Sequence, residues 1–190
     1  MTSQVIVEKQ KLDNPPFQIH YLGDRVLRQS AKRISRVDDE TRRLIREMLQ
    51  TMYSADGIGL AAPQVGVQKQ LIVIDCEPDN AATPPLILIN PTIKKSSQEI
   101  SPFQEGCLSI PGVYMDVTRP EVIEVSFKDE TGRPRTIRAN ELLSRAIQHE
   151  MDHLEGVLFV DRVENQLALT QELTKYKFSP KAVKPIKPMK

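Results

Sequence analysis

The sequence predicts a single domain of the α+β class. Helical periodicity occurs in two segments, 38–55 and 141–155, and short apolar or alternating segments lie between them. These short segments do not alternate with helices, as the strands of a parallel sheet would, so antiparallel or mixed sheets are expected. A chain of 190 residues is long enough to bury a core and to enclose a ligand pocket.

The first predicted helix covers residues 38–55. Asp38 or Asp39 can cap its first turn, and Gly57 is the expected stop. Apolar residues three and four positions apart form one stripe, which predicts a buried face. They are Leu44, Ile45, Met48, Leu49 and Met52. The next stretch, 57–66, is rich in glycine and proline, so no regular structure is expected there.

Four strands are predicted in the middle of the chain. Residues 71–75 and 86–90 are continuous apolar runs, which is typical of buried strands. The polar segment 77–85 between them is expected to be a solvent loop. Residues 121–127 alternate apolar and polar side chains and can pair with 133–138 through a short turn, which predicts a β-hairpin.

The second predicted helix, 141–155, begins after Asn140 as a cap and stops at Gly156. Its apolar face consists of Leu143, Ala146, Ile147, Met151 and Leu154. The apolar pattern ends further along, and the segment from Lys175 to Lys190 contains six lysines, three prolines and no acid. Such a composition predicts a mobile tail.

We therefore divide the chain into three parts: an N-terminal lead (1–16), a main domain (17–165) and a helical and basic C-terminal tail (166–190). The chain has 26 basic and 25 acidic residues, so its net charge of +1 favours neither DNA nor a membrane as a partner. No apolar run approaches the roughly 20 residues of a membrane span. Two cysteines are too few for a disulfide framework, and the N-terminus has no apolar signal core. These features favour the cytoplasm, with an organelle stroma or matrix left open.

The strongest chemical signal is the segment His-Glu-Met-Asp-His on the second predicted helix. His149 and His153 are four residues apart, so both imidazoles can point from one helix face to the same metal ion. Glu150 starts near that face and can reach a water on the metal. An exposed charged helix could show this pattern by chance, but the chain has only three histidines and two of them fill it. The third, His20, is expected to be an ordinary surface or hydrogen-bonded histidine.

A catalytic zinc-like site needs a third protein ligand and an open position for water. No histidine follows His153, whereas Cys107 lies upstream in a Glu-Gly-Cys-Leu-Ser segment and can supply a thiolate. Two alternatives stay open. A zinc endopeptidase would take a third ligand after His153, and a purely structural metal site would need Cys76 as a fourth ligand.

Three segments in this order resemble the motifs of peptide deformylases: Gly-Ile-Gly-Leu-Ala-Ala-Pro-Gln-Val-Gly at 57–66, Glu-Gly-Cys-Leu-Ser at 105–109, and Gln-His-Glu-Met-Asp-His-Leu-Glu-Gly at 148–156. The segment 24–28 resembles the start of that family, and the likeness extends over about residues 17–165. The resemblance implies antiparallel or mixed sheets packed around a central metal-binding helix, with an N-terminal helix. It also implies the removal of the N-terminal formyl group from formylmethionine of new polypeptides, with release of formate.

The resemblance further implies roles for individual residues. Cys107, His149 and His153 would bind one divalent metal ion, with Fe²⁺ favoured in the cell and Zn²⁺, Ni²⁺ or Co²⁺ as alternatives. A water on that ion would attack the formyl carbon, with Glu150 as the general base. The remaining assignments are Gln64 and Leu108 as oxyanion donors and Ile58, Gly59, Gly106 and Ala146 as substrate-binding residues.

Several assignments have an ordinary structural alternative. Gln64 could only stabilise its loop, Gly57 could only serve a turn, and Ala146 could be a simple core residue. Glu105 and Asp152 are candidates to orient the imidazoles, or else members of ordinary salt bridges. The expected partners are N-formylmethionyl nascent peptides. The basic tail suggests a weak contact with the ribosome, since a short basic segment attracts phosphate.

Overall fold

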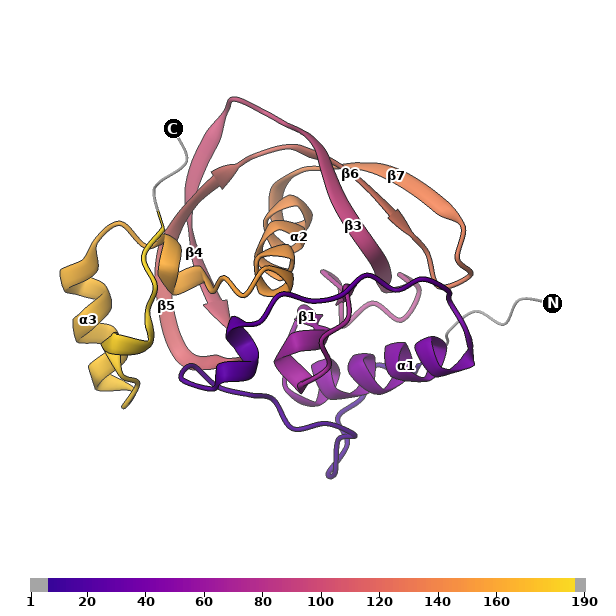
Figure 1. Cartoon of the computed structure of the whole chain (residues 1–190), viewed down its shortest axis with the longest axis horizontal. Helices are drawn as coiled ribbons and strands as arrows, with labels where there is room; N and C mark the ends of the chain where they lie inside the picture. Colours follow the sequence, from indigo (N-terminus) through magenta and orange to yellow (C-terminus); the bar gives the residue numbers. More distant parts are fainter. Residues whose placement is uncertain (1–6, 187–190) are drawn as a thin grey trace.

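A computed structural model describes residues 7–186 of the chain and shows an α+β fold (Figure 1). Five antiparallel strands form the main sheet, in the order β1-β2-β3-β6-β7, and two further strands form a separate antiparallel hairpin, β4-β5. The strands are β1 (Gly59–Ala61), β2 (Leu71–Ile74), β3 (Leu86–Ser96), β4 (Ile100–Cys107), β5 (Ile110–Pro120), β6 (Ile123–Lys128) and β7 (Pro134–Ala139). The predicted fold class is therefore confirmed.

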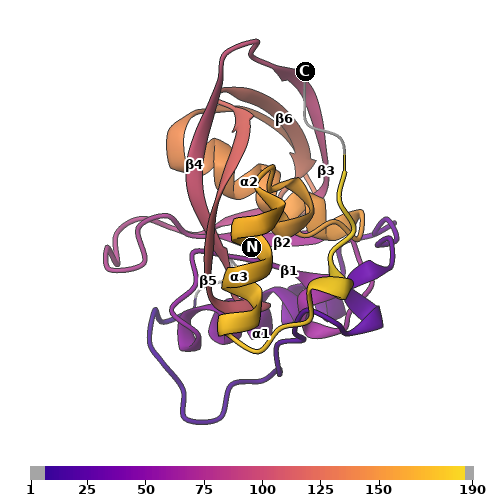
Figure 2. The same cartoon turned by 90° about the vertical axis from the view of Figure 1, so that its left-hand side faces the viewer.

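Three α-helices pack around these strands: α1 (Asp39–Ser54), α2 (Glu141–Leu154) and α3 (Gln166–Lys175). In Figure 1, α2 lies near the middle of the molecule, with β3, β6 and β7 on one side and the β4-β5 hairpin on the other. The view in Figure 2 shows α3 on the outside of β5. The helix that carries the His-Glu-Met-Asp-His segment is thus the central helix of the fold.

Strand β2 is buried on both faces because two helices cover opposite sides of the main sheet. Leu71 and Val73 belong to the hydrophobic cluster that contains the apolar face of α1. Ile72 and Ile74 belong to the cluster that contains Ala146, Ile147 and Leu154 of α2. An apolar side chain is favoured at every position of such a strand, which explains the continuous run in the sequence.

The hairpin predicted in the second half of the chain is present as β6 and β7, with Ile123 opposite Ala139 and Lys128 opposite Pro134. The β4-β5 hairpin was not predicted, because β4 mixes apolar and polar residues without clear alternation. The expectation of no regular structure over residues 57–66 was wrong in part. Gly59–Ala61 forms β1, which pairs with β2.

The ends of the helices agree with the sequence only in part. Asp38 caps α1 by accepting a hydrogen bond from the Thr41 amide, as expected. At the other end, the left-handed residue is Asp56 (φ 57°) and not Gly57. The Gly57 amide donates to the Met52 carbonyl at 3.0 Å across the turn that ends α1, which agrees with a turn role for Gly57. A Cβ at Gly57 would also lie 2.6 Å from Cδ1 of Leu108, so packing favours glycine there as well.

The expected mobile tail is folded against the domain as far as residue 186. The Asp161 carboxylate accepts from the amide of Lys184 at 2.7 Å, and Arg28 Nη2 donates to the carbonyl of Ala182 at 2.6 Å. Phe178 and Val183 pack against the cluster formed by α3 and β5. Residues 187–190 of the predicted tail lie outside the described residues.

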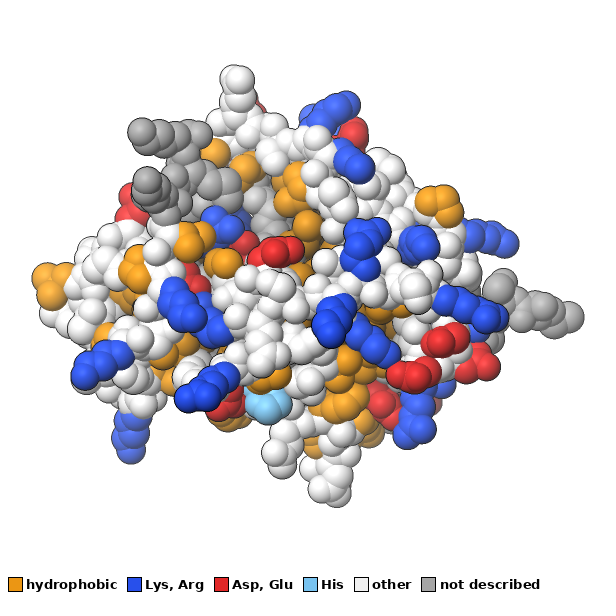
Figure 3. All heavy atoms as spheres, viewed as in Figure 1, with side chains coloured by type: hydrophobic (Ala, Val, Ile, Leu, Met, Phe, Trp, Pro, Cys, Tyr) orange, Lys and Arg blue, Asp and Glu red, His pale blue; other side chains and the backbone are white. Residues whose placement is uncertain are grey.

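No helix within residues 7–186 is long and apolar enough to cross a membrane. Figure 3 shows Lys and Arg side chains spread over one face of the molecule, with Asp and Glu side chains among them. This mixture agrees with the net charge of +1.

Candidate metal centre

The fold brings three side chains with metal-binding atoms together at the end of β4. His149 and His153 lie one turn apart on α2, with ring centroids 5.2 Å from each other. Cys107 is the last residue of β4, and its Sγ lies 3.3 Å from Nε2 of His153. One ligand atom from each residue lies within 4.8 Å of the others. Cys107 and His153 are 46 residues apart in the sequence. Packing of the β4-β5 hairpin against α2 therefore brings the three side chains together.

The 3.3 Å between Sγ of Cys107 and Nε2 of His153 fits two ligands of one tetrahedral metal ion. Ligands at the usual Zn–S and Zn–N distances lie roughly 3.5 Å apart in that geometry. Within residues 7–186 the group comprises Cys107, His149 and His153, and Cys76 does not belong to it. The alternative of a structural metal site with Cys76 as the fourth ligand is thus contradicted. The group also contains no residue after His153, which a zinc endopeptidase would need as its third ligand.

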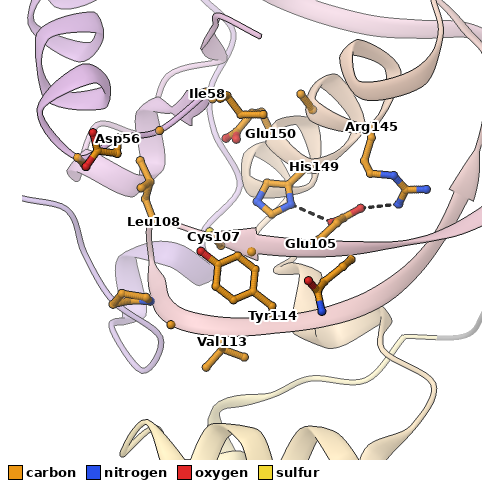
Figure 4. Close-up of a pocket in the computed structure, with 18 of the residues that line it drawn as sticks. Asp56, Ile58, Glu105, Cys107, Leu108, Val113, Tyr114, Arg145, His149 and Glu150 are labelled. Carbon is orange, nitrogen blue, oxygen red and sulfur yellow. Dashed lines mark hydrogen bonds and ion pairs between the residues drawn. The ribbon is translucent and has the colours of Figure 1, made fainter. Parts of the chain in front are cut away.

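A buried ion-pair network holds His149 in place. Glu105 Oε2 lies 3.0 Å from Nδ1 of His149, which leaves Nε2 of the same ring for a metal (Figure 4). The same carboxylate accepts from Nε of Arg119 at 2.6 Å and from Nη1 of Arg145 at 2.8 Å. Burial raises the pKa of Glu105, but the hydrogen bonds from His149 and Arg119 lower it well below its usual range. These donors favour the ionised form of Glu105, and its carboxylate orients the imidazole.

The two imidazoles have opposite electrostatic surroundings. Burial lowers the pKa of His149, but hydrogen bonds to Cys107 and Glu105 outweigh it and raise that pKa well above its ordinary value. Burial and the neighbouring charge of His149 lower the pKa of His153 well below its ordinary value. The negative groups around His149 attract a cation, and the neutral His153 ring has a lone pair to offer it.

Glu150 lies beside this group and is 5% exposed. Its Oε2 has no hydrogen-bond partner within residues 7–186. Burial raises the pKa of Glu150 to about 7. A Cβ at Gly59 of β1 would lie 2.5 Å from Oε1 of Glu150, so the strand and the carboxylate are in direct contact. An orphaned buried carboxylate is unusual in proteins and indicates a missing partner at this place.

Gln64 is 1% exposed and its amide is bound at both ends. Its Oε1 accepts from the backbone amide of Ala61 at 2.8 Å, which fixes the orientation of the group. Its Nε2 donates to Ser109 Oγ at 3.1 Å and lies 3.5 Å from Sγ of Cys107. The amide thus stabilises its loop and also points toward the group of candidate ligands.

A cleft of about 520 Å³ opens over these residues. All the expected substrate-binding positions line it, together with Leu108 and Glu150: Ile58, Gly59, Gly106 and Ala146. β1 forms one edge of the main sheet, and the end of β4 lies across the cleft (Figure 4). Four exposed apolar side chains also line the cleft: Tyr21, Phe103, Tyr114 and Leu142.

Sequence reasoning missed the two arginines of the network and left the role of one acid, Asp152, open. Arg119 is 1% exposed, and Arg145 donates to Glu105 from one turn before His149. No signal distinguishes them in the sequence, because arginine is usually a surface residue. Asp152 pairs with Arg119 at 2.8 Å and with Arg162. It belongs to a salt bridge rather than to an imidazole, so the structural alternative for Asp152 holds. His20 pairs with Asp24 at 3.0 Å, as an ordinary histidine would.

Three candidate ligands, an adjacent carboxylate without a partner in the described chain, and an open cleft are typical of metal-dependent hydrolases. The comparisons with known proteins narrow this class. The polypeptide deformylase family model matches residues 16–168. Peptide deformylase 1 of Nostoc sp. is 74% identical over 186 residues, covering 98% of this chain and 100% of the relative. The peptide deformylase of Synechocystis sp. is 63% identical at the same coverage, 98% and 100%.

Solved structures agree with these relatives. The crystal structure of a peptide deformylase from Synechococcus elongatus, in complex with actinonin, has a TM-score of 0.94 at 65% identity and covers 95% of this chain and 98% of that one. A plant peptide deformylase has a TM-score of 0.80 at 40% identity, with 87% and 89% covered. This chain belongs to the polypeptide deformylase family, metal-dependent hydrolases that remove the formyl group from new polypeptides. The enzyme class predicted from the sequence is confirmed.

Proposed function

We propose that this chain deformylates N-formylmethionyl nascent peptides with Cys107, His149 and His153 as metal ligands and Glu150 as the general base. One observation carries the assignment. Glu150, whose Oε2 has no partner within the described residues, lies beside a group of three ligand atoms in an open cleft. Three protein ligands leave one coordination position for water, which is the arrangement of catalytic rather than structural sites.

A divalent ion in this group would lower the pKa of a water molecule toward about 7 and so supply a nucleophile at neutral pH. We propose ferrous iron as the metal ion in the cell, because the family resemblance favours it. Zinc, nickel and cobalt also suit a Cys-His-His set, because selectivity among these ions depends on geometry and availability.

The chain's own residues then handle protons and charge. Glu150 takes a proton from the attacking water and returns it to the leaving amine. Gln64 and Leu108 stabilise the oxyanion that forms on the formyl oxygen when the formyl carbon is attacked. The amide of Gln64 is already oriented by Ala61 and donates without titrating. The backbone N–H of Leu108 follows the ligand Cys107 directly, so its position is linked to the position of the metal.

The substrate backbone fits between the two strand edges. Gly59 begins β1 and Ile58 directly precedes it, and Gly106 lies near the end of β4. The outer edge of β1 has no partner strand in the described sheet. Main-chain hydrogen bonds to such an edge bind a peptide without regard to its side chains. Ala146 is 7% exposed and lines the cleft, and its small side chain leaves room for the methionine side chain.

We also propose a cytoplasmic location and a weak contact with the ribosome, where formylated chains are made. The C-terminal segment presents four exposed lysines on a backbone that is fixed to the domain: Lys175, Lys177, Lys181 and Lys184. Their charges would be attracted to phosphate, and added salt would weaken the contact. Replacing these four lysines by alanine should lower ribosome binding at low salt without changing turnover of a short peptide. Unchanged ribosome binding would remove this contact.

The experiment that tests the function is anaerobic purification followed by metal analysis and a formate-release assay on a formylmethionyl tripeptide. We expect about one metal ion per chain and release of formate in proportion to metal content. The unformylated tripeptide and an internal peptide bond serve as matched control substrates. Metal-replete protein that releases no formate, or that cleaves internal bonds, would contradict the proposal.

A further inference from the structure

The described part of the N-terminal lead contains a buried cation, Lys9. Its Nζ lies 3.1, 2.8 and 2.7 Å from the backbone oxygens of Glu77, Asn80 and Thr83. It also lies 2.6 Å from Oδ2 of Asp75, and the two side chains are 10% and 1% exposed. The loop after β2, expected from the sequence to be a solvent loop, is folded around this ammonium group. We call these four oxygens the Lys9 cradle.

Asp75 connects the Lys9 cradle to the substrate cleft. Its backbone amide donates to the carbonyl of Ile58 at 2.8 Å. This bond extends the β1-β2 ladder one residue beyond the pair of Gly59 and Ile74. Its carboxylate also accepts from the Tyr53 hydroxyl of α1 at 2.7 Å. One side chain therefore links the lead, the end of α1 and the segment that enters β1.

The lead makes further contacts beside the same segment. Lys11 pairs with Asp56 at 2.7 Å, and the Leu12 amide donates to Ser54 Oγ at 3.1 Å. The side chains of Lys11 and Asp56 are 64% and 72% exposed, and an exposed pair of this kind contributes little. The Lys9 pair is buried, so its loss leaves a carboxylate with no counter-charge.

We propose that Lys9 is a positioning residue for substrate binding, and that its ammonium group occupies a site built for a monovalent cation or a primary amine. The proposal rests on the assignment of Ile58 and Gly59 to the substrate backbone. Without the ammonium, the Asp75 carboxylate keeps only neutral donors, the Tyr53 hydroxyl and the amide of Glu77. Asp75 must then recruit a cation from solution or move, and Ile58 moves with it.

Substitutions of Lys9 test this role by comparing KM with kcat for a formylmethionyl tripeptide. Lys9→Ala should raise KM about tenfold with kcat nearly unchanged, because binding of the substrate backbone is disturbed and the metal site is not. Its Tm should fall by about 10 °C, since a buried carboxylate loses its counter-charge. Lys11→Ala is the matched control on the same lead and should change neither quantity.

Methylammonium chloride should restore both KM and Tm of Lys9→Ala, because the ion reproduces the Cε–Nζ end of the missing side chain and all of its N–H donors. Tetramethylammonium chloride at equal concentration has no N–H donor and should restore neither. Lys9→Met, which fills the space with an apolar chain, should show the same losses without rescue. These three results together would separate filling of the cradle from a general salt effect.

A wild-type KM for Lys9→Ala, measured where the variant is fully folded, would overturn the positioning role whatever its Tm. Rescue of Tm without rescue of KM would do the same. If Lys9→Ala does not fold, Lys9→Gln keeps a donor in the cradle and the same KM criterion applies to it. Absence of formate release by the wild-type enzyme would instead contradict the proposed function, and the methylammonium effect on Tm would still decide whether the cradle binds a cation.

Discussion

Gly59→Ala should inactivate the enzyme by moving Glu150. A Cβ at Gly59 would lie 2.5 Å from Oε1 and 3.1 Å from Cδ of Glu150, whereas ordinary contact begins at 3.4 Å. The carboxylate would therefore have to move by about 0.9 Å, the difference between 3.4 and 2.5 Å. Gly59 is in a strand and has no positive φ, so alanine itself fits the backbone.

A misplacement of about 1 Å in a reacting group can cost about 10²-fold in rate, equal to about 2.7 kcal/mol in the barrier. We expect this loss in kcat/KM for formate release from a formylmethionyl tripeptide. Metal content and Tm should stay close to wild type, because neither the candidate ligands nor the core is disturbed. Both quantities are measured on the same preparation as the kinetics.

A double-mutant cycle decides whether the loss acts through the carboxylate. In the background of Glu150→Ala there is no carboxylate to displace, so Gly59→Ala should add little further loss. Full additivity of the two substitutions would refute the reasoning, as would a single Gly59→Ala variant within about threefold of wild type. Additivity would assign the effect of Gly59 to substrate contact alone.

Four further outcomes follow from the site and its surroundings. Glu150→Ala should keep its metal and lose about 10²–10⁴-fold in kcat, whereas Cys107→Ala should lose the metal itself. Both variants should therefore be poorly active, and metal analysis should distinguish them. Glu105→Gln should weaken metal affinity about 10–100-fold, because a neutral amide holds His149 less firmly than a carboxylate does; a chelator titration measures it, and wild-type affinity would contradict the role. Iron-loaded enzyme should lose activity in air and nickel-loaded enzyme should not, because the thiolate and ferrous iron oxidise together; equal half-lives in air would contradict this expectation. Burial raises the pKa of Asp129, but hydrogen bonds in the β6-β7 turn outweigh it and lower the pKa from 3.8 to about 2. The free energy of unfolding should therefore fall as the pH drops through that window. Urea unfolding at several pH values measures this, and Asp129→Asn should abolish that part of the pH dependence.

The sequence by itself determined the features that depend on spacing along one element. The interval of four between His149 and His153 sets both imidazoles on one helix face in any context. The apolar runs of β2 and β3 and the alternation of β6 predicted strands, because period and length depend on local geometry. Ordered motifs also identified the family, since they reflect residue types that one chemistry requires.

Long-range geometry could not be read from the sequence. The β4-β5 hairpin has no clear period in the sequence, yet its packing brings Cys107 to the two histidines. In the sequence, Asp152 beside His153 and Glu105 two residues before Cys107 are equal candidates to orient an imidazole. Only packing pairs Asp152 with Arg162 and Glu105 with His149. The arginines that the fold buries beside each carboxylate determine its orientation.

The termini show the same division most clearly. Composition predicted a mobile tail, but Asp161 and Arg28 hold it to the domain through contacts that join distant parts of the chain. Lys9 has the appearance of an ordinary surface lysine, and only the fold surrounds its ammonium group with four oxygens. A local pattern determines what an element is, whereas desolvation and partners, which decide what a charged residue does, exist only once distant segments meet.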